Sequence, residues 1–315
     1  MLDFNKRKKM KIAMLGLGKM GGNMSARLIR NGISVVGYDY DQTVVQDLVN
    51  KENLIPASSV ADALSKLDGQ KIVWMMLPAG DVTEKQIHDL IPLLNPGDII
   101  VDGGNSNYKR TVKMGKLLEE HNLGFMDCGT SGGVWGLDNG YCLMVGASNE
   151  VASAVEPVLR ALAVTQQNGW AHVGPVGSGH FTKMIHNGIE YGMMESLAEG
   201  LELLKGKEEF NLDIAKVTEL WRHGSVVRSW LLDLTAEALA AGEESMDDIA
   251  PYVADSGEGR WTVVESIEQG IPAPVLTLAL QVRFRSQEKN QKGYGYKLLS
   301  VMRNAFGGHV MKRKS

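Results

Sequence analysis

A polar stretch between residues 177 and 192, GSGHFTKMIHNGIEYG, holds the side chains of this chain that are best suited to acid–base chemistry. Its polar residues recur at spacings of three, four and seven: Lys183, His186, Asn187, Glu190 and Tyr191. At about 100° per residue, these side chains fall within an arc of roughly 140° on one face of a helix. A lysine and a glutamate two turns apart can exchange protons with one bound molecule from different positions. The alternative interpretation is an ordinary helix whose charged face is solvated.

The apolar residues of this stretch must bury the rest of the helix, which we expect to span residues 178–206. Met184, Ile185, Ile189 and Met193 lie largely on the other faces and can pack against a core. The polar face is therefore expected to form the wall of a site.

Length and composition indicate a globular protein of two domains. The 315 residues exceed the usual size of one domain, and 44% hydrophobic with 22% charged residues is an ordinary globular composition. The formal net charge of −4 gives no basic field of the kind that binds nucleic acid. No run approaches the ~18 apolar residues that cross a bilayer. Cys128 and Cys142 have no spacing typical of a metal site or a disulfide framework, so we expect no metal and a cytoplasmic location.

The first half of the chain alternates strand-like and helical patterns. Residues 1–10 are expected to be a disordered lead-in; their basic stretch resembles the start of a signal peptide, but the apolar run after it is only about seven residues long and continues into glycines. Strands that alternate with helices indicate a mostly parallel sheet, and so a Rossmann-like α/β domain. The predicted strands are residues 11–16, 33–39, 72–77, 98–104, 125–130 and 141–147.

The first predicted strand leads into G-L-G-K-M-G, which matches the G-x-G-x-x-G fingerprint of dinucleotide-binding domains. Gly16 permits the tight turn, Gly18 lets the backbone approach a pyrophosphate, and Gly21 lets helix and strand pack closely. The helix that follows offers unpaired N–H groups to the phosphates. The residues expected to contact the cofactor here are Gly16, Gly18, Lys19, Met20 and Gly21. Simple turns before a helix are the alternative.

A carboxylate closes the second predicted strand. Asp39 lies 23 positions after Gly16, where it can hold the ribose hydroxyls of the adenosine. An aspartate there repels a 2′-phosphate, and Tyr40 rather than an arginine follows it, so the sequence favours NAD over NADP. Asn105, at the end of another strand, is expected at the same sheet edge, where it can contact cofactor or substrate. An ordinary surface aspartate and a turn-forming asparagine are the alternatives.

After Gly179 the strand signal fades and helical patterns dominate. We therefore expect an α/β NAD-binding domain over residues 1–177 and an all-α domain for substrate binding and oligomerisation over residues 178–315. The long helix begins at this boundary, and its polar face is expected to meet the cofactor in the cleft between domains, where ligands often bind. The predicted helices are residues 178–206 and segments near 211–222, 225–241, 259–269 and 273–290.

Four motifs give the chain a resemblance to a known family. They are DGGNS (102–106), GTSGGVWG (129–136), GHFTKMIHNGIEYG (179–192) and RNAFGGH (303–309). In this order they resemble the 6-phosphogluconate dehydrogenases, the decarboxylating enzymes of the pentose phosphate pathway, in their shorter bacterial form. The related 3-hydroxyisobutyrate dehydrogenases share the glycine fingerprint, the SGG loop and the helix lysine, but they lack the HNGIEYG continuation.

The resemblance implies the oxidative decarboxylation of 6-phosphogluconate to ribulose 5-phosphate and CO2, with reduction of NAD. It implies that Lys183 is the general base and Glu190 the general acid, and that Tyr191 and Arg283 meet the phosphate. The residues that it implies for substrate binding are Asn105, Ser131, Gly132, Gly133, His186, Asn187, Tyr191, Arg283, Arg303 and His309.

The same resemblance implies an oligomer. Arg303 and His309 would be supplied by the tail of a neighbouring subunit, so a homodimer or homotetramer is expected. Phe306 and two glycines amid polar groups are consistent with a tail that docks. A frayed basic terminus is the alternative.

Two departures from the family pattern matter. Longer members carry K-G-T-G where this chain has S-G-E-G at 256–259, and Glu258 would oppose a phosphate dianion. Arg260 just beyond can compensate. Asp39 and Tyr40 replace the Asn-Arg pair of NADP-using relatives, in agreement with the preference for NAD.

Two other functions compete with this interpretation. The first is a 3-hydroxyisobutyrate-type dehydrogenase that acts on a small, unphosphorylated hydroxy acid. Arg283, Arg303 and His309 favour a phosphorylated substrate instead, whereas Ser256 and Glu258 argue mildly the other way. The second is a catalytically idle NAD-sensing domain, and the presence of Lys183 with its partner glutamate speaks against it.

Overall fold

The structure of the chain, a computed structural model, describes residues 10–243, 246–289 and 291–313. It forms two compact units, Met1–Lys183 and Met184–Ser315, and the division falls within one long helix. The lead-in that was expected to be disordered lies outside the described residues, apart from Met10.

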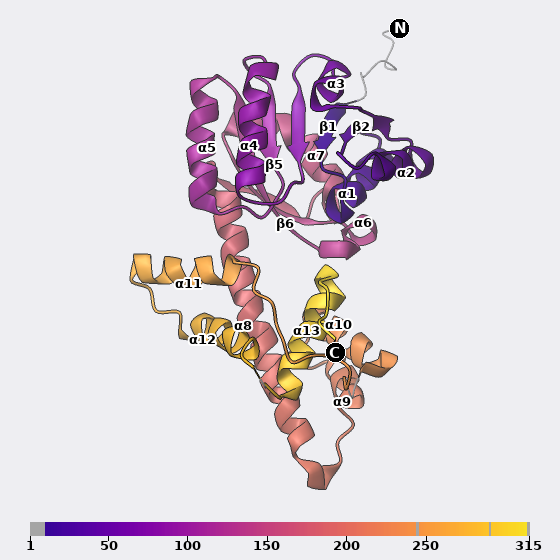
Figure 1. The fold of residues 1–315 in the computed structure, drawn as a ribbon, viewed down its shortest axis with the longest axis vertical. Coiled ribbons are helices and arrows are strands. Elements are labelled where there is room, and N and C mark those ends of the chain that lie inside the picture. Colours follow the sequence, from indigo (N-terminus) through magenta and orange to yellow (C-terminus); the bar gives the residue numbers. More distant parts are fainter. Residues whose placement is uncertain (1–9, 244–245, 290, 314–315) are drawn as a thin grey trace. The chain divides into compact units, whose positions relative to one another are not determined.

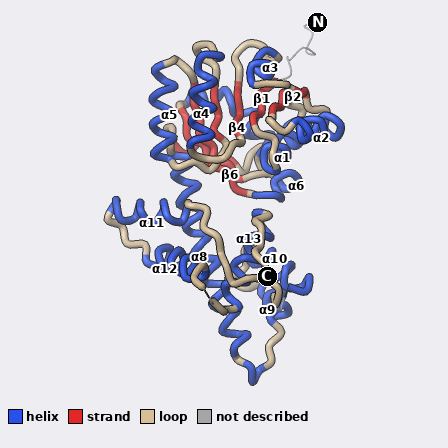
Figure 2. The backbone as a smooth tube through the Cα atoms, viewed as in Figure 1, coloured by secondary structure: helices blue, strands red, loops and turns tan. Residues whose placement is uncertain are grey.

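The first unit is built on one sheet with the strand order β3-β2-β1-β4-β5-β6-β7-β8 (Figures 1 and 2). Neighbouring strands are parallel, except that β6 and β7 are antiparallel. The predicted Rossmann-like, mostly parallel sheet is therefore confirmed. Its strands are β1 (Lys11–Leu15), β2 (Ser34–Tyr38), β3 (Ile55–Pro56), β4 (Ile72–Met75), β5 (Ile99–Asp102), β6 (Gly124–Ser131), β7 (Cys142–Ala147) and β8 (Trp170–Gly174).

Helices connect these strands and cover both faces of the sheet, as crossover connections between parallel strands require. They are α1 (Lys19–Arg30), α2 (Gln42–Glu52), α3 (Val60–Ser65), α4 (Asp81–Leu90), α5 (Tyr108–Glu120), α6 (Gly136–Asn139) and α7 (Asn149–Leu162), with 3-10 helices at Ile91–Leu93 and Gly133–Trp135.

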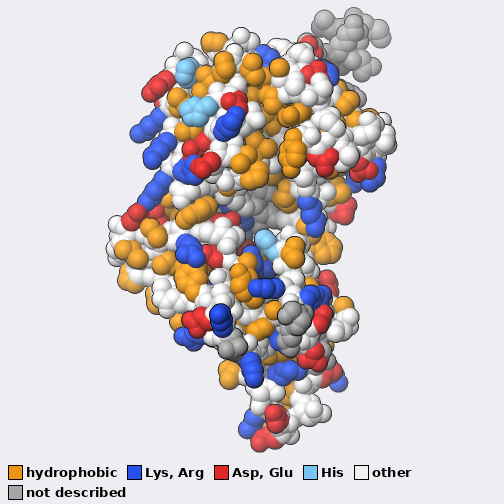
Figure 3. Space-filling view, viewed as in Figure 1, with side chains coloured by type: hydrophobic (Ala, Val, Ile, Leu, Met, Phe, Trp, Pro, Cys, Tyr) orange, Lys and Arg blue, Asp and Glu red, His pale blue; other side chains and the backbone are white. Residues whose placement is uncertain are grey.

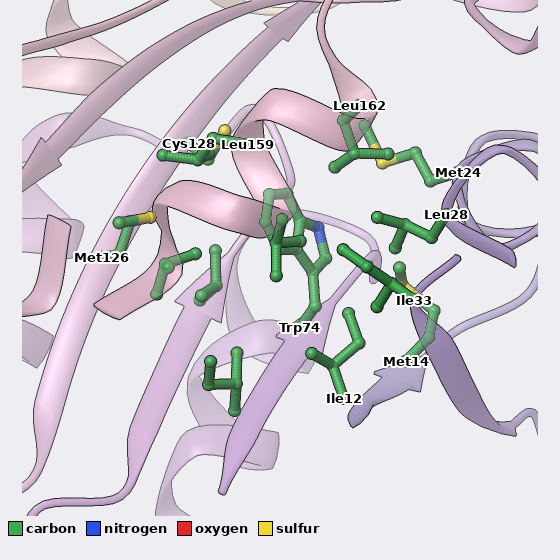
Figure 4. Packing of buried hydrophobic residues seen from close by; sticks show 14 of the residues in the cluster. Ile12, Met14, Met24, Leu28, Ile33, Trp74, Met126, Cys128, Leu159 and Leu162 are labelled. Atoms are coloured by element: carbon green, nitrogen blue, oxygen red, sulfur yellow. The ribbon is translucent and has the colours of Figure 1, made fainter. Parts of the chain in front are cut away.

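Alternate residues of the strands divide between two apolar cores, one on each face of the sheet. Ile12 and Met14 of β1 belong to the core that α1 and α7 complete. Ala13 and Leu15 belong to the core under α3, α4 and α5. Trp74 of β4, which is fully buried, lies amid the first of these cores (Figure 4). Strands buried on both faces are apolar throughout, which is why most strands of this sheet could be predicted from apolar runs in the sequence.

The second unit is helical. Methionine and leucine side chains of α8 and α13 pack with residues of α9 in its largest core. The expected all-α second half and the expected long helix are both confirmed. The helices are α8 (Ser178–Gly206), α9 (Ile214–Trp221), α10 (Trp230–Ala238), α11 (Glu258–Gln269), α12 (Pro274–Ser286) and α13 (Tyr294–Gly307), with short turns of helix at Glu208–Phe210 and Leu239–Glu243. Within the described ranges, no helix is both long and apolar enough to span a bilayer.

The structure corrects the sequence-based prediction in three respects. The strands β3 and β8 were not predicted, because β3 has only two residues and β8 has no residue that is fully buried. No helix was predicted after residue 290, whereas α13 runs from Tyr294 to Gly307 and includes the start of the tail. Ile189 and Met193 were expected to bury α8, but they are 50% and 44% exposed.

Candidate active site

The carboxyl ends of four parallel strands form the edge at which the first unit presents its candidate residues. β1, β4, β5 and β6 are neighbours in the sheet, so the segments that follow them meet at this edge. The glycine fingerprint follows β1, Asn105 follows β5, and Ser131 ends β6. Ligands of open α/β sheets bind at such an edge.

The fingerprint loop has the open backbone that a pyrophosphate needs. Gly16 has φ +88°, and a Cβ there would lie 2.5 Å from a carbonyl oxygen that follows β4. A Cβ at Gly21 would collide with the carbonyl of Gly16, whereas nothing lies within 4 Å of a Cβ at Gly18. Lys19 and Met20 begin α1, and no side chain of the described residues caps this helix end. Its first N–H groups therefore suit an anion such as the cofactor pyrophosphate.

The carboxylate of Asp39 is held against the fingerprint loop. One oxygen accepts the N–H of Leu17 at 2.7 Å, and the other accepts the N–H of Asp41 at 2.9 Å. Each oxygen keeps a further lone pair, which suits a ribose hydroxyl. Tyr40, beside it, is 91% exposed. A fixed negative charge at this position fits the ribose of NAD and opposes a 2′-phosphate.

The loop after β6 also has backbone open to a ligand. Gly132 and Gly133 follow Ser131 with φ of +125° and +52°, which are conformations that favour glycine. The Asn105 side-chain oxygen accepts the N–H of Thr130 at 3.4 Å, so Asn105 lies beside the end of β6. The structure thus brings four of the predicted substrate residues together. Successive N–H groups in such a loop can bind a carboxylate.

Lys183 lies in the second turn of α8 and is only 5% exposed. Its aliphatic stem packs on Gly129 of β6: a Cβ at Gly129 would collide with Lys183 Cβ and lie 3.1 Å from Lys183 Cγ. The same Cβ would lie 2.8 Å from the carbonyl oxygen of Gly179. The strand therefore has room for this lysine because residue 129 has no side chain. Gly129 lies two positions before Ser131, so the lysine stem packs next to the loop after β6.

Two polar residues that hold the start of α8, Asp127 of β6 and His180 of α8, were not predicted as site residues. Asp127 of β6 accepts the N–H groups of Gly177 at 2.6 Å and His180 at 2.7 Å. The ring Nδ1 of His180 lies 2.7 Å from Thr111 Oγ1. Asp127 stands four positions before Ser131, on the same face of the strand, and this period of two was the signal that could have identified it.

Three further candidate residues follow along α8 in the second unit. His186 Nδ1 and Asn187 Oδ1 lie 3.0 Å apart. Glu190 lies near enough to Arg283 for its charge to act on that residue. Burial lowers the pKa of Arg283, and the negative charge of Glu190 is among the groups that oppose this change. Lys183 and Glu190 are seven residues apart on one helix, which is a separation of about 10 Å along its axis.

Tyr191 and Arg283 form a buried pair in the second unit. The guanidinium carbon of Arg283 lies 3.2 Å from the centroid of the Tyr191 ring. The Tyr191 hydroxyl donates to Asp255 Oδ1 at 3.3 Å and lies 3.2 Å from Ser256 Oγ. Arg283 is 1% exposed, and its Nη1 has no hydrogen-bond partner among the described residues. A buried cation with an unpaired N–H group suits an anionic ligand.

Arg303 and His309 lie near Arg283 within a single chain. Partial burial of the ring, followed by the positive charges of Arg303 and Arg283, lowers the pKa of His309 to about 4, although the residue keeps contact with solvent. The tail beyond His309 contacts its own chain, because Ala250 donates its N–H to the carbonyl of Lys312 at 2.9 Å. Supply of these two residues by a neighbouring subunit stays a prediction.

The segment that departs from the family pattern packs around Tyr191. A Cβ at Gly259 would collide with the Tyr191 ring. Glu258 buries an oxygen, Oε2, for which the described residues offer no hydrogen-bond partner. Arg260 forms an ion pair with Asp255. This pairing reduces the positive charge that Arg260 was expected to offer a phosphate.

Two family models together match nearly all of the chain. The model of the NAD binding domain of 6-phosphogluconate dehydrogenase matches residues 11–174. The model of the 6-phosphogluconate dehydrogenase C-terminal domain matches residues 179–315.

Similar proteins and structures agree with these matches. An NAD(+)-dependent, decarboxylating 6-phosphogluconate dehydrogenase of Haloferax volcanii is 37% identical, over 97% of this chain and 99% of its own length. An enzyme of the same name from Bacillus subtilis is 34% identical, over 89% of this chain and 62% of its own length. The structure of Plasmodium falciparum 6-phosphogluconate dehydrogenase superposes with a TM-score of 0.80 at 25% identity, covering 93% of this chain and 70% of that one.

Proposed function

The chain belongs to the 6-phosphogluconate dehydrogenase family, and on this premise we propose that it converts 6-phosphogluconate to ribulose 5-phosphate and CO2 with reduction of NAD. The observation that carries the proposal is the buried Lys183, whose stem packs against β6 next to the loop that starts at Ser131. The helix that holds this amine also carries Glu190. A small, unphosphorylated hydroxy acid has less support as substrate, because both family models bear the name of the phosphogluconate enzyme.

The fingerprint loop and Asp39 are the groups that we propose to hold NAD. Gly18 leaves its backbone open, and the carboxylate of Asp39 is fixed by two backbone N–H groups. When bound, NAD accepts the hydride from the substrate. We propose that Asn105, at the same sheet edge, orients the substrate hydroxyl that is oxidised.

Lys183 is the proposed base for the oxidation step. A lysine amine with its usual pKa near 10.4 is a poor base at neutral pH, but burial disfavours its charged form. The neutral amine takes the proton of the C3 hydroxyl as the C3–H bond breaks. The amine, now an ammonium group, donates a hydrogen bond to the new C3 carbonyl oxygen and so stabilises the enolate that forms as CO2 leaves.

Glu190 is the proposed acid for the last step. Loss of CO2 leaves an enediol, and its protonation at the carbon that held the carboxylate gives ribulose 5-phosphate. Glu190 and Lys183 lie two turns apart on α8, so each can reach a different atom of one substrate. His186 and Asn187, which lie between them, are proposed to bind the sugar hydroxyls.

We further propose that Arg283 binds the substrate phosphate, together with Arg303 and His309 from the tail of a neighbouring subunit. The unpaired Nη1 of Arg283 supports this assignment. Tyr191 is less well placed to contact the phosphate itself, because its hydroxyl already contacts Asp255 and Ser256. Its ring instead stacks against the guanidinium of Arg283.

The decisive experiment measures initial rates with 6-phosphogluconate, using NAD and NADP in parallel, and follows both reduced cofactor and released CO2. We expect NAD to be preferred and CO2 to equal the cofactor reduced. Lys183→Met should lower kcat by about 10²–10⁴-fold. In Glu190→Gln, proton delivery to C1 of the product, ribulose 5-phosphate, should fail. A normal rate with normal uptake of solvent deuterium at this carbon would reject the role of Glu190. Turnover of 3-hydroxyisobutyrate but not of 6-phosphogluconate would overturn the proposed substrate.

We infer that copies of the chain associate through the hairpin of α11 and α12. An open groove of about 700 Å³ lies there, lined mainly by apolar side chains, with Ser266, Thr277 and Gln281 among them. Ile267, Val275 and Leu278 are 74%, 63% and 54% exposed. Hydrophobic side chains are visible over this part of the surface in Figure 3. Such a patch on a globular protein favours burial against a partner, and a second copy completes a homo-oligomer.

Sedimentation analysis tests this assembly. Ile267→Asp is expected to shift the chain to a smaller species, because it places a charge in the proposed interface. Leu93→Asp, at an exposed apolar position of the first unit (44% exposed), is the matched control and should leave the oligomer intact. An oligomer that survives Ile267→Asp at the wild-type concentration would place the interface elsewhere.

A cytoplasmic location is also proposed. Cys128 and Cys142 are both free thiols, one buried and one exposed, which suits a reducing compartment. Cell fractionation tests this proposal, and recovery of the protein outside the cytoplasm would contradict it.

A further inference from the structure

One face of strand β6 sets the position of the catalytic helix. Asp127, Gly129 and Ser131 alternate along β6, so their side-chain positions lie on the same face of the strand. The Asp127 carboxylate accepts two N–H groups from the start of α8, and Gly129 receives the stem of Lys183. Ser131 begins the loop that is proposed to bind substrate. Three successive positions on this face therefore hold the helix start, contact the stem of Lys183 and begin the substrate loop.

Asp127 serves as a helix cap that comes from the sheet. The first N–H groups of a helix have no partner within the helix. Asp127 Oδ1 accepts the N–H of Gly177 at 2.6 Å, and Oδ2 accepts the N–H of His180 at 2.7 Å. Asp127 itself is fully buried. Because the acceptor belongs to β6 and not to the turn before the helix, the bonds fix α8 to the strand.

A second contact fixes the rotation of this helix end. The Nδ1 atom of His180 lies 2.7 Å from Thr111 Oγ1, which belongs to α5. His180 and Thr111 are 1% and 2% exposed. His180 precedes Lys183 by three residues, so the turn that leads to the lysine is held from two directions.

We propose that Asp127 is a positioning residue for Lys183, acting through the capped first turn of α8. This inference rests on the proposed function of Lys183 as the base. Asp127 needs both oxygens as acceptors, because each N–H group uses a different one. An asparagine offers one acceptor oxygen and one NH2 group, so Asp127→Asn leaves one N–H facing another donor. The helix start then shifts or rotates, and the amine moves with it.

Burial raises the pKa of Asp127, while the charge of His180 and the two N–H bonds oppose this change. The carboxylate of Asp102 is also near enough to raise it. On balance the pKa is raised, so the need for a carboxylate at this position rests on the two N–H groups that its two oxygens accept.

The test compares Asp127→Asn with wild-type enzyme in kcat, in KM for NAD and in the isotope effect of 6-phosphogluconate deuterated at C3. We expect kcat to fall about 10–100-fold, as a displacement of about 1 Å in a reacting group does. The KM for NAD should stay within about twofold, because the fingerprint loop is untouched. The isotope effect on kcat should rise, because the misplaced base makes hydrogen transfer the slow step. Loss of stability alone would not change the isotope effect.

Asp98→Asn is a matched control. Asp98 is also buried, and its two oxygens also accept backbone N–H groups, from Lys71 at 2.8 Å and Asn95 at 2.9 Å. It precedes β5, at the opposite edge of the sheet from the candidate site. Asp98→Asn is expected to lower Tm but to keep kcat and the isotope effect of the wild-type enzyme.

If Asp127→Asn does not fold, kcat and the isotope effect are measured in Thr111→Val instead. This variant removes the Thr111 hydroxyl that contacts His180 and keeps the Asp127 carboxylate. An unchanged isotope effect and kcat in the folded Asp127→Asn enzyme would overturn the inference. Where that variant does not fold, the same result in Thr111→Val would overturn it. Inactivity of the wild-type enzyme on 6-phosphogluconate is a different outcome, which would overturn the proposed function before any variant is made.

Discussion

Gly129→Ala is the sharpest perturbation of the candidate site, because it adds one methyl group against the aliphatic stem of Lys183. The new Cβ would lie 2.8 Å from the Gly179 carbonyl oxygen and 3.1 Å from Lys183 Cγ, and it would collide with Lys183 Cβ. None of these atoms is the free end of a flexible side chain. The start of α8 must therefore move away from β6.

The size of this movement follows from the contacts. To reach an ordinary contact of 3.4 Å, the Gly179 oxygen alone must recede by about 0.6 Å, and Lys183 Cβ by more. A displacement of about 1 Å in a reacting group can cost about 10²-fold in rate, so we expect kcat to fall about 10–100-fold. Overpacking of a well-packed core typically costs about 1–3 kcal/mol, so Tm should also fall.

The assay is the initial rate of cofactor reduction with saturating 6-phosphogluconate and NAD, together with the NAD affinity and a thermal melt. NAD affinity should remain near that of the wild-type enzyme, since the fingerprint loop is not in contact with residue 129. Gly200→Ala is the matched control: it lies in the same helix, and nothing lies within 4 Å of its added Cβ. It should keep kcat and add up to about 1 kcal/mol of stability. A folded Gly129→Ala enzyme with wild-type kcat would refute the packing argument.

Three further changes test other parts of the molecule. Asp39→Asn removes the charge that opposes a 2′-phosphate, so the ratio of kcat/KM for NAD over NADP should fall at least about tenfold; an unchanged ratio would contradict the role of the carboxylate. Arg283→Lys removes the planar group that stacks on Tyr191 and should raise the KM for 6-phosphogluconate about tenfold or more, with the KM for NAD unchanged; equal effects on both would point to general disruption. Burial, and then the negative charge of Glu199, raises the pKa of Glu195 to about 7. The folded state therefore holds a proton that the unfolded state releases between about pH 4.5 and 7, so stability should fall as pH rises through this window. Glu195→Gln should flatten this slope in melts at pH 5 and pH 8, and an identical slope in both proteins would show that another group titrates.

Much of the fold was predictable because its signals are local. The buried strands of the sheet appear as continuous apolar runs, and the helix from Ser178 to Gly206 follows from periodicity alone. The polar face with Lys183 and Glu190 follows from the same periodicity. The fingerprint around Gly18 has the strand and helix that its function requires.

The tertiary structure decided what these elements touch. Periodicity places Ile189 and Met193 on one side of α8, but it cannot tell whether anything covers them, and both remain half exposed. The short strand β3 becomes a strand only because β2 offers it hydrogen bonds. Likewise, the pairing of Arg283 with Tyr191 joins residues far apart in the chain.

The sequence by itself determined which chemical groups this protein has and on which helix they lie. Only the tertiary structure decided how the lysine is held, because Asp127 and Gly129 act on it across more than 50 positions of chain. Such contacts depend on the pairing of β6 with its neighbours and on close packing of glycine backbones. The period of two places Asp127 and Gly129 on one face of β6, but it does not show that this face receives α8, since the two segments are distant in the chain and become neighbours only when it folds.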